Sequence, residues 1–189
     1  MSHVPSDASD FGLEIPDAPK LEVVRKDPAP KDSEICPSQL TPDTAEISDL
    51  NQNVWTYNGQ HIVSVPRRSN VTPVTMSSFS CRHSVPPKQN SRFPIYFGIE
   101  NPEKCLCCEK IKGKPTLQLK NKKLIDLYTA PIPVKKFLFY RNQTGSTSTF
   151  ESVAFPGWFI ASSGKGQPLF LTSNLGGAHN TAFIYKHRY

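Results

Sequence analysis

Three cysteines crowd into the segment Cys105-Leu106-Cys107-Cys108, so metal binding is the first chemistry to consider. Tetrahedral zinc sites usually combine a CxxC pair with a second pair of Cys or His ligands. On an extended strand, Cys105 and Cys107 would share one face and Cys108 would point to the other. No second ligand pair accompanies them in the sequence. We therefore expect free thiols on a strand, with no metal and no cofactor.

Two other short segments contain residue types that are used in catalysis or phosphate binding. Cys81 and His83 could form a thiol–imidazole pair, but such pairs are normally assembled from distant parts of a chain. The segment SSGKGQ (162–167) places Lys165 between two glycines. It does not match a phosphate-binding loop, because Phe159 stands where the first glycine is required and no Ser or Thr follows the lysine. We therefore expect no enzymatic activity.

The net charge changes sign along the chain. Residues 1–50 contain eleven acidic and four basic side chains, for a net charge of −7, whereas residues 51–189 have a net charge of +13. The first segment is rich in proline and lacks sustained apolar periodicity. We therefore predict a disordered extension over 1–44 and a folded domain over 45–189. The basic domain leaves heparin or nucleic-acid binding open, although a solvated basic face explains the same composition and no nucleic-acid-binding motif is present.

The sequence also bears on the cellular compartment. The first twenty residues are acidic and contain no apolar segment of the kind found in secretory signals. No apolar run approaches the ~18 residues that span a bilayer. Five cysteines, an odd number, are typical of reduced thiols and not of a disulfide framework. We expect synthesis in the cytosol and no membrane insertion.

Short apolar segments separated by turn residues dominate the chain after Val54 and predict an all-β domain. Eleven candidate strands lie at 54–58, 61–65, 73–81, 93–100, 104–111, 115–120, 135–141, 146–155, 157–163, 167–173 and 181–187. The first two are expected to form a hairpin across Gly59 and Gln60, and residues 122–128 one short helical turn. So many short strands favour a closed barrel or a sandwich, and this pattern leaves both a β-trefoil and a jelly roll open.

The segment FESVAFPGWFIASS (150–163) carries a more specific pattern than the strands around it. Its residues Phe150-x-Ser152-Val153-x-x-Pro156-x-x-Phe159-Ile160-Ala161 resemble the signature of the interleukin-1 cytokine family. The chain departs from the family at Ser162, where threonine is usual, and at Phe170, where a smaller aliphatic residue is usual. Collinear blocks over the whole of 45–189, among them DLNQNVWTYNGQHIVSVPR (49–67) and PIYFGIENPEKCLCCEK (94–110), are similar to the interleukin-36 branch.

This resemblance implies a β-trefoil of about twelve strands and an extracellular, pro-inflammatory cytokine released by a leaderless route. Its implied partners are interleukin-1 receptor-like 2, which is the interleukin-36 receptor, and the interleukin-1 receptor accessory protein, with signalling to NF-kappa-B and MAP kinases in epithelial and immune cells. A monomer is expected before receptor binding. A receptor antagonist of the same fold is the near alternative. Residues Phe150, Ser152, Pro156, Trp158, Phe159 and Ile160 are expected to be structural, with Trp158 buried.

Two kinds of functional position follow from the resemblance. In this branch the active form begins a short fixed distance before a hydrophobic-x-Asp motif, which Ile47-Ser48-Asp49 matches, so a processing protease is expected to cut between Pro37 and Ser38. Receptor-binding loops are expected at ENPEK and within NLGGAHNT, where strand ends project from the barrel. Their residues are Glu100, Asn101, Pro102, Glu103, Lys104, Asn174, Gly176, Gly177, His179 and Asn180.

Overall fold

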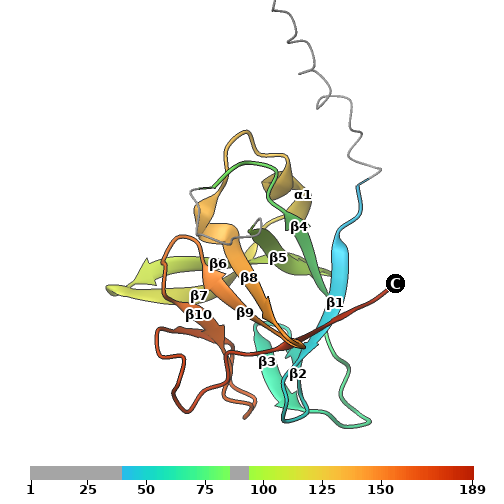
Figure 1. Ribbon diagram of the computed structural model, residues 1–189. Helices are drawn as coiled ribbons and strands as arrows, with labels where there is room; N and C mark the ends of the chain where they lie inside the picture. The colour runs from blue at the N-terminus through green and yellow to red at the C-terminus, as the bar shows by residue number, and fades with distance from the viewer. Residues whose placement is uncertain (1–39, 86–93) are drawn as a thin grey trace, which may run out of the picture. The chain divides into compact units, whose positions relative to one another are not determined.

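The computed structural model describes residues 40–85 and 94–189, and these residues form twelve β-strands with one short α-helix and one short 3-10 helix (Figure 1). The strands are β1 (Asp43–Ser48), β2 (Asn53–Tyr57), β3 (Ile62–Pro66), β4 (Met76–Ser80), β5 (Ile95–Glu100), β6 (Glu103–Ile111), β7 (Lys114–Asn121), β8 (Leu138–Thr144), β9 (Thr147–Ser152), β10 (Phe159–Ala161), β11 (Phe170–Thr172) and β12 (Ile184–His187). The helices are α1 (Leu124–Tyr128) and the 3-10 turn η4 (Lys135–Phe137).

The strands pair in one antiparallel sheet whose two ends meet. The sheet runs in the order β11-β10-β9-β8-β5-β4-β1-β2-β3, with the β6–β7 hairpin added to β5 and β12 added to β1. A bridge between Val63 of β3 and Pro168, just before β11, joins the ends, and the Leu169 amide donates to the Ile62 carbonyl at 2.9 Å. Closure leaves few exposed strand edges. The fold is a β-trefoil, as the resemblance implied.

The predicted first hairpin is confirmed, and its turn shows how local side chains determine register. Strands β2 and β3 pair from Asn53 with Pro66 to Tyr57 with Ile62. In the turn between them, the Asn58 side-chain oxygen accepts hydrogen bonds from the amides of Gln60 and His61 at 2.9 and 2.7 Å. This is the arrangement for which asparagine is favoured in turns. The short helix expected at 122–128 is also present as α1.

Strand β1 was not predicted from the sequence. It begins at Asp43, so the observed fold includes two residues that the sequence analysis assigned to the extension. Residues 1–39, and with them most of the predicted disordered extension, lie outside the described residues. Strand β1 pairs with β12, β4 and β2, and its residues Ala45 and Ile47 are completely buried. Its stability therefore comes from distant partners and not from a local pattern.

Aromatic side chains fill the centre of the domain. Trp55, Phe97, Phe150 and Phe183 are all fully buried. Phe97 and Phe150 stack with ring centroids 5.0 Å apart, and Trp55 meets Phe183 edge-on at 5.0 Å. These are the offset and edge-to-face geometries that aromatic pairs prefer. The ring cluster is what the strands of the barrel close around.

A second, smaller cluster separates the cysteines as period-two alternation predicts. Cys105 and Cys107 pack with Tyr96 and Leu127 in this cluster, whereas Cys108 belongs to the central core. Gly98 of β5 permits the approach of β6, because a Cβ atom there would lie 2.4 Å from the Lys104 carbonyl oxygen. In the part of the chain that the structure describes, no helix is long and apolar enough to cross a membrane.

Candidate functional site

Within residues 40–85 and 94–189, the four cysteines and His83 are engaged in the fold and do not form a reactive centre. The Cys81 sulfur lies 3.8 Å from the Tyr96 hydroxyl, and His83 Nε2 lies 2.8 Å from the Ala130 carbonyl oxygen, so each has a partner other than its neighbour. Burial raises the pKa of the Cys105 thiol to about 12 and that of Cys107 to about 11. Such thiols are protonated at neutral pH, and a protonated thiol is a poor nucleophile.

The signature segment forms the corner between β9 and β10. The amide of Gly157, at φ +89°, donates to the Glu151 carboxylate at 2.8 Å, and the Phe155 amide donates to the Ser152 hydroxyl at 3.0 Å. Phe150, Ser152 and Ile160 are fully buried, whereas Pro156 is exposed and Phe159 half-buried. The expectation that Trp158 is buried is wrong. It lies just before β10, is only partly buried and packs against the central core.

The hydrophobic-x-Asp motif is also structural. Ile47 is fully buried in β1, and Asp49, in the turn between β1 and β2, is 97% inaccessible. Its carboxylate accepts hydrogen bonds from the Asn51 amide at 2.8 Å and from the amide and side-chain nitrogen of Asn53, both at 3.0 Å. The motif thus holds the end of β1 in place. Pro37 and Ser38 lie outside the described residues.

Replacing Asp49 with alanine is expected to lower the free energy of unfolding by about 2–3 kcal/mol, because two backbone amides and the Asn53 side chain lose a charged and largely buried acceptor. Urea denaturation measures the change. The matched control is Asp126→Ala in α1, an exposed carboxylate at a helix start, for which less than about 1 kcal/mol is expected. Equal effects of the two substitutions would contradict a structural role for Asp49.

The first expected receptor loop is a tight turn between two paired strands. Glu100 ends β5 and pairs with Glu103 of β6, so only Asn101 and Pro102, joined by a cis peptide bond, lie in the turn itself. The Glu100 carboxylate accepts a hydrogen bond from the Ser77 hydroxyl at 3.1 Å, and Lys104 pairs with both β5 and β7. Much of this segment therefore has a structural role.

The second expected loop connects β11 and β12 and is more open. Asn174, Gly176, Gly177 and His179 are exposed, whereas Asn180 exchanges two backbone hydrogen bonds with Ser162 at 2.9 and 3.0 Å. His179 packs edge-on against Phe170 with ring centroids 4.8 Å apart. The larger side chain at position 170, where the sequence departs from the family, therefore supports this loop.

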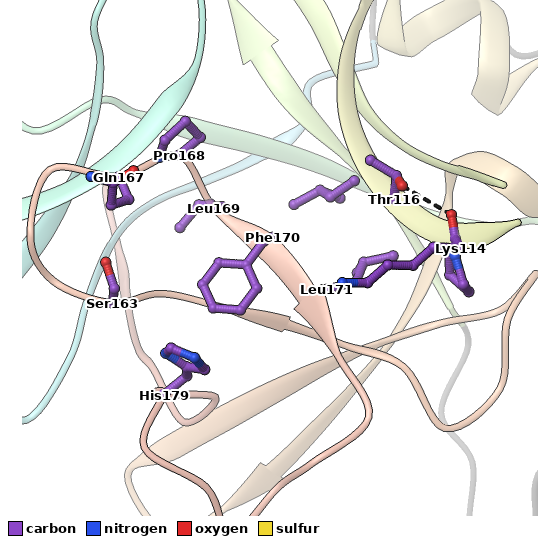
Figure 2. A pocket seen from close by; sticks show the side chains of 11 residues that line it. Lys114, Thr116, Ser163, Gln167, Pro168, Leu169, Phe170, Leu171 and His179 are labelled. Atoms are coloured by element: carbon purple, nitrogen blue, oxygen red, sulfur yellow. Dashed lines mark hydrogen bonds between the residues drawn. The ribbon is translucent and has the colours of Figure 1, made fainter. Parts of the chain in front are cut away.

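A pocket of about 500 Å³ lies between this loop and the tip of the β6–β7 hairpin (Figure 2). It is lined by Lys114, Pro115, Thr116, Leu117, Ser163, Gln167, Pro168, Leu169, Phe170, Leu171 and His179. Figure 2 shows Phe170 and His179 together on one side and Lys114 with Thr116 on the other. The sequence analysis did not identify this pocket. Its walls come from segments about fifty residues apart, and no local pattern reports their approach.

The two expected loops do not form one continuous surface. The Asn101–Pro102 turn lies at one end of the β6–β7 hairpin, next to the pairing of Lys104 with Asn121. His179 lies at the other end, across the pocket from Lys114. Seven residues separate Lys104 from the far end of β6, which corresponds to roughly 23 Å of strand. A partner that touched both loops would have to follow the length of the hairpin.

Comparison with known proteins identifies the family to which the chain is similar. The family profile described as Interleukin-1 / 18 matches residues 75–184. Human interleukin-36 alpha is 49% identical over 144 residues, which cover 76% of this chain and 91% of that protein. The mouse interleukin-36 receptor antagonist protein is 41% identical over 80 residues, which cover 42% of this chain and 51% of that protein.

A solved structure agrees with these sequence similarities. The NMR structure of the pro-inflammatory cytokine interleukin-36alpha is 47% identical, superposes with a TM-score of 0.66, and covers 79% of this chain and 95% of that one. The similarity thus extends over the trefoil as a whole and is not confined to the signature segment. The chain belongs to the interleukin-1 family of cytokines, in its interleukin-36 branch, and is not an enzyme.

Proposed function

We propose that this protein is a pro-inflammatory agonist that binds interleukin-1 receptor-like 2 and then recruits the interleukin-1 receptor accessory protein. The observation that carries the proposal is the 49% identity to human interleukin-36 alpha over nearly the whole length of that protein. The solved interleukin-36alpha is itself named a pro-inflammatory cytokine. No catalytic step is involved, since the work is done by binding energy that brings two receptors together and starts signalling to NF-kappa-B and MAP kinases.

Within the branch we propose that the chain is the gamma paralogue, with alpha as the alternative. The segments ENPEKCLCCEK (100–110) and SDLNQNVW (48–55) support this proposal because they resemble the gamma member. A receptor antagonist remains the competing function, and the mouse antagonist protein matches part of this chain. Antagonist and agonist would share the fold and the first receptor, and would differ in recruitment of the second.

The proposed route to activity is cytosolic synthesis, leaderless release and removal of residues 1–37 by a protease, which leaves the trefoil domain with a short N-terminal segment. The test uses protein that begins at Ser38, applied to epithelial cells that carry both receptors and an NF-kappa-B reporter. An agonist gives a dose-dependent response that disappears in cells lacking interleukin-1 receptor-like 2. A silent protein that blocks the response to an established agonist would identify an antagonist.

We further propose that the two loops contribute to recruitment of the accessory protein. Variants replace Asn101-Pro102, residues 174–179, or both with Gly-Ser segments of equal length, and leave the paired residues Glu100, Glu103, Lys104 and Asn180 in place. Because the loops lie at opposite ends of the β6–β7 hairpin, we expect each change alone to weaken recruitment and the combined change to lower reporter potency by at least about tenfold.

The decisive measurement for the loops is a pull-down of the accessory protein by the preformed complex of cytokine and first receptor. First-receptor binding is expected to persist in the combined variant. The control replaces Ser146, in the turn between β8 and β9, with glycine and leaves Gly145, at φ +63°, in place. Undiminished recruitment by the combined variant, or an equal loss in the control, would place the agonist surface elsewhere.

A further inference from the structure

Five lysines that are separated in the sequence meet at one end of the β6–β7 hairpin. Lys120 is the last residue but one of β7, Lys122 and Lys123 lead into α1, and Lys135 and Lys136 form the start of η4. We refer to Lys120, Lys122, Lys123, Lys135 and Lys136 as the lysine cluster. Figure 1 shows α1 and the turn before β8 in the upper part of the domain, above the β6–β7 hairpin.

Contacts with β6 bring these segments together. The ammonium groups of Lys120 and Lys136 lie 2.7 and 3.0 Å from the two carboxylate oxygens of Glu109. The Cys105 thiol donates to the Lys122 carbonyl at 3.4 Å. Cys105 and Cys107 are two residues apart on one face of β6. Burial raises the pKa of both thiols. The charge of Lys122 opposes this rise at Cys105, and the charges of Lys136 and Lys120 oppose it at Cys107. The positive charges therefore face one region.

Glu109 is the acid at the centre of this arrangement. It contacts two of the five lysines, and both of those ion pairs are open to solvent, so each contributes little to stability. Lys122, Lys123 and Lys135 are exposed. Glu103 and Asp126 lie at the edges of the region, on β6 and α1. A small excess of positive charge thus faces solvent along an extended line, since Lys120 to Lys123 alone span about 10 Å.

We propose that the lysine cluster binds a linear sulfated polysaccharide of the heparan sulfate type. Lysine ammonium groups are compact point charges that suit sulfates, whereas the planar bidentate contacts of arginine are missing from these segments. Single-stranded nucleic acid would need exposed rings on which bases stack. The ring within the cluster, that of Phe137, is 95% inaccessible, and Lys136 lies over it at 5.8 Å from the centroid. The choice of an extracellular polymer rests on the proposed function.

The test measures binding of a fluorescent heparin decasaccharide to the full chain between about 50 and 300 mM NaCl. The variant Lys122→Ala/Lys123→Ala/Lys135→Ala leaves both partners of Glu109 in place. We expect it to weaken binding roughly tenfold or more near 150 mM salt and to reduce the slope of log Kd against log[NaCl] by about 2–3. The matched control is Arg67→Ala/Arg68→Ala/Lys165→Ala, which removes the same charge from exposed positions elsewhere.

Glu109→Gln tests the proposal with the opposite change in charge. It removes the central negative charge and releases Lys120 and Lys136, so binding is expected to tighten about two- to fivefold. Glu46→Gln makes the same charge change beside Arg188 and is expected to have less effect. A control triple variant that weakens binding as much as the cluster variant, or equal effects of the two glutamine variants, would overturn the proposal in favour of net charge alone.

Two further measurements distinguish a polysaccharide partner from nucleic acid, and polysaccharide binding from receptor activation. A 20-nucleotide single strand of DNA that binds through the same lysines as tightly as the decasaccharide would replace the polysaccharide with nucleic acid as the partner. The cluster variant is expected to keep its full reporter response at saturating dose. Loss of the response together with heparin binding, in a folded protein, would overturn the proposal in favour of a receptor contact, because the Asn101–Pro102 turn lies at the same end of the β6–β7 hairpin. A wild-type chain that binds heparin but never activates the reporter would contradict only the proposed agonist function.

Discussion

Alanine at position 150 is expected to lower the free energy of unfolding of this domain by about 3–5 kcal/mol, because it opens a cavity at the centre of the ring cluster. Phe150 is fully buried and stacks on Phe97, with Trp55 and Phe183 at centroid distances of 6.3 and 6.4 Å. The strands around it are hydrogen-bonded on both sides and can relax only partly into the space. Chemical denaturation monitored by tryptophan fluorescence measures the loss.

Trp158→Ala is the matched control for this prediction, since it removes a larger ring from the same signature segment. Trp158 is half-buried, so its removal is expected to cost about 1–2 kcal/mol. The same denaturation experiment compares the two variants. If Trp158→Ala destabilised the domain more than Phe150→Ala, the core would be centred on the corner and not on the ring cluster.

Removal of residues 1–37 is expected to raise reporter potency by at least about tenfold, which corresponds to 1.4 kcal/mol of additional receptor binding. Ser38 is five residues before the start of β1, so a new terminus there can lie at most about 17 Å from Asp43. A short terminus held at the edge of the domain can pack beside a receptor, whereas an acidic extension would obstruct the approach. Dose–response curves of the full and shortened chains provide the measurement.

The position of the cut is tested separately from its existence. A chain that begins at Ser33 retains five more residues, including Glu34, and is expected to remain nearly as weak as the full chain. Asp49→Ala in the shortened chain loosens the β1–β2 turn and is expected to reduce the gain. Equal potency of the full chain and the chain that begins at Ser38 would refute processing as the route to activity.

Local patterns predicted those elements whose stability depends on near neighbours. Alternation placed Cys105 and Cys107 opposite Cys108, because the side-chain period of a strand is independent of what it pairs with. The hairpin at Gly59 follows from turn chemistry within a few residues. Trp158 was expected to be buried, but it precedes β10 and lies in the corner, where the chain is not a strand.

Elements whose stability depends on distant segments could not be predicted from local patterns. The segment DTAEIS contains few of the residues typical of strands, and it is a strand because β4 and β12 flank it. The pocket beside His179 and the lysine cluster likewise join segments far apart in the chain. The sequence identified the residues of the pocket and the cluster as loop residues and charged residues. It could not show that they lie close together, because their proximity depends on closure of the barrel.

The pairing of β1 with β12 has a consequence for synthesis. Ala45 is opposite His187, and the Arg188 amide donates to the Thr44 carbonyl at 2.9 Å, so the first strand completes its hydrogen bonds only with almost the last residues of the chain. Translation makes β1 about 140 residues before β12, so the barrel can close only after β12 has left the ribosomal exit tunnel. Until then the β1 edge of a nascent chain stays open, which exposes it to chaperones and to aggregation.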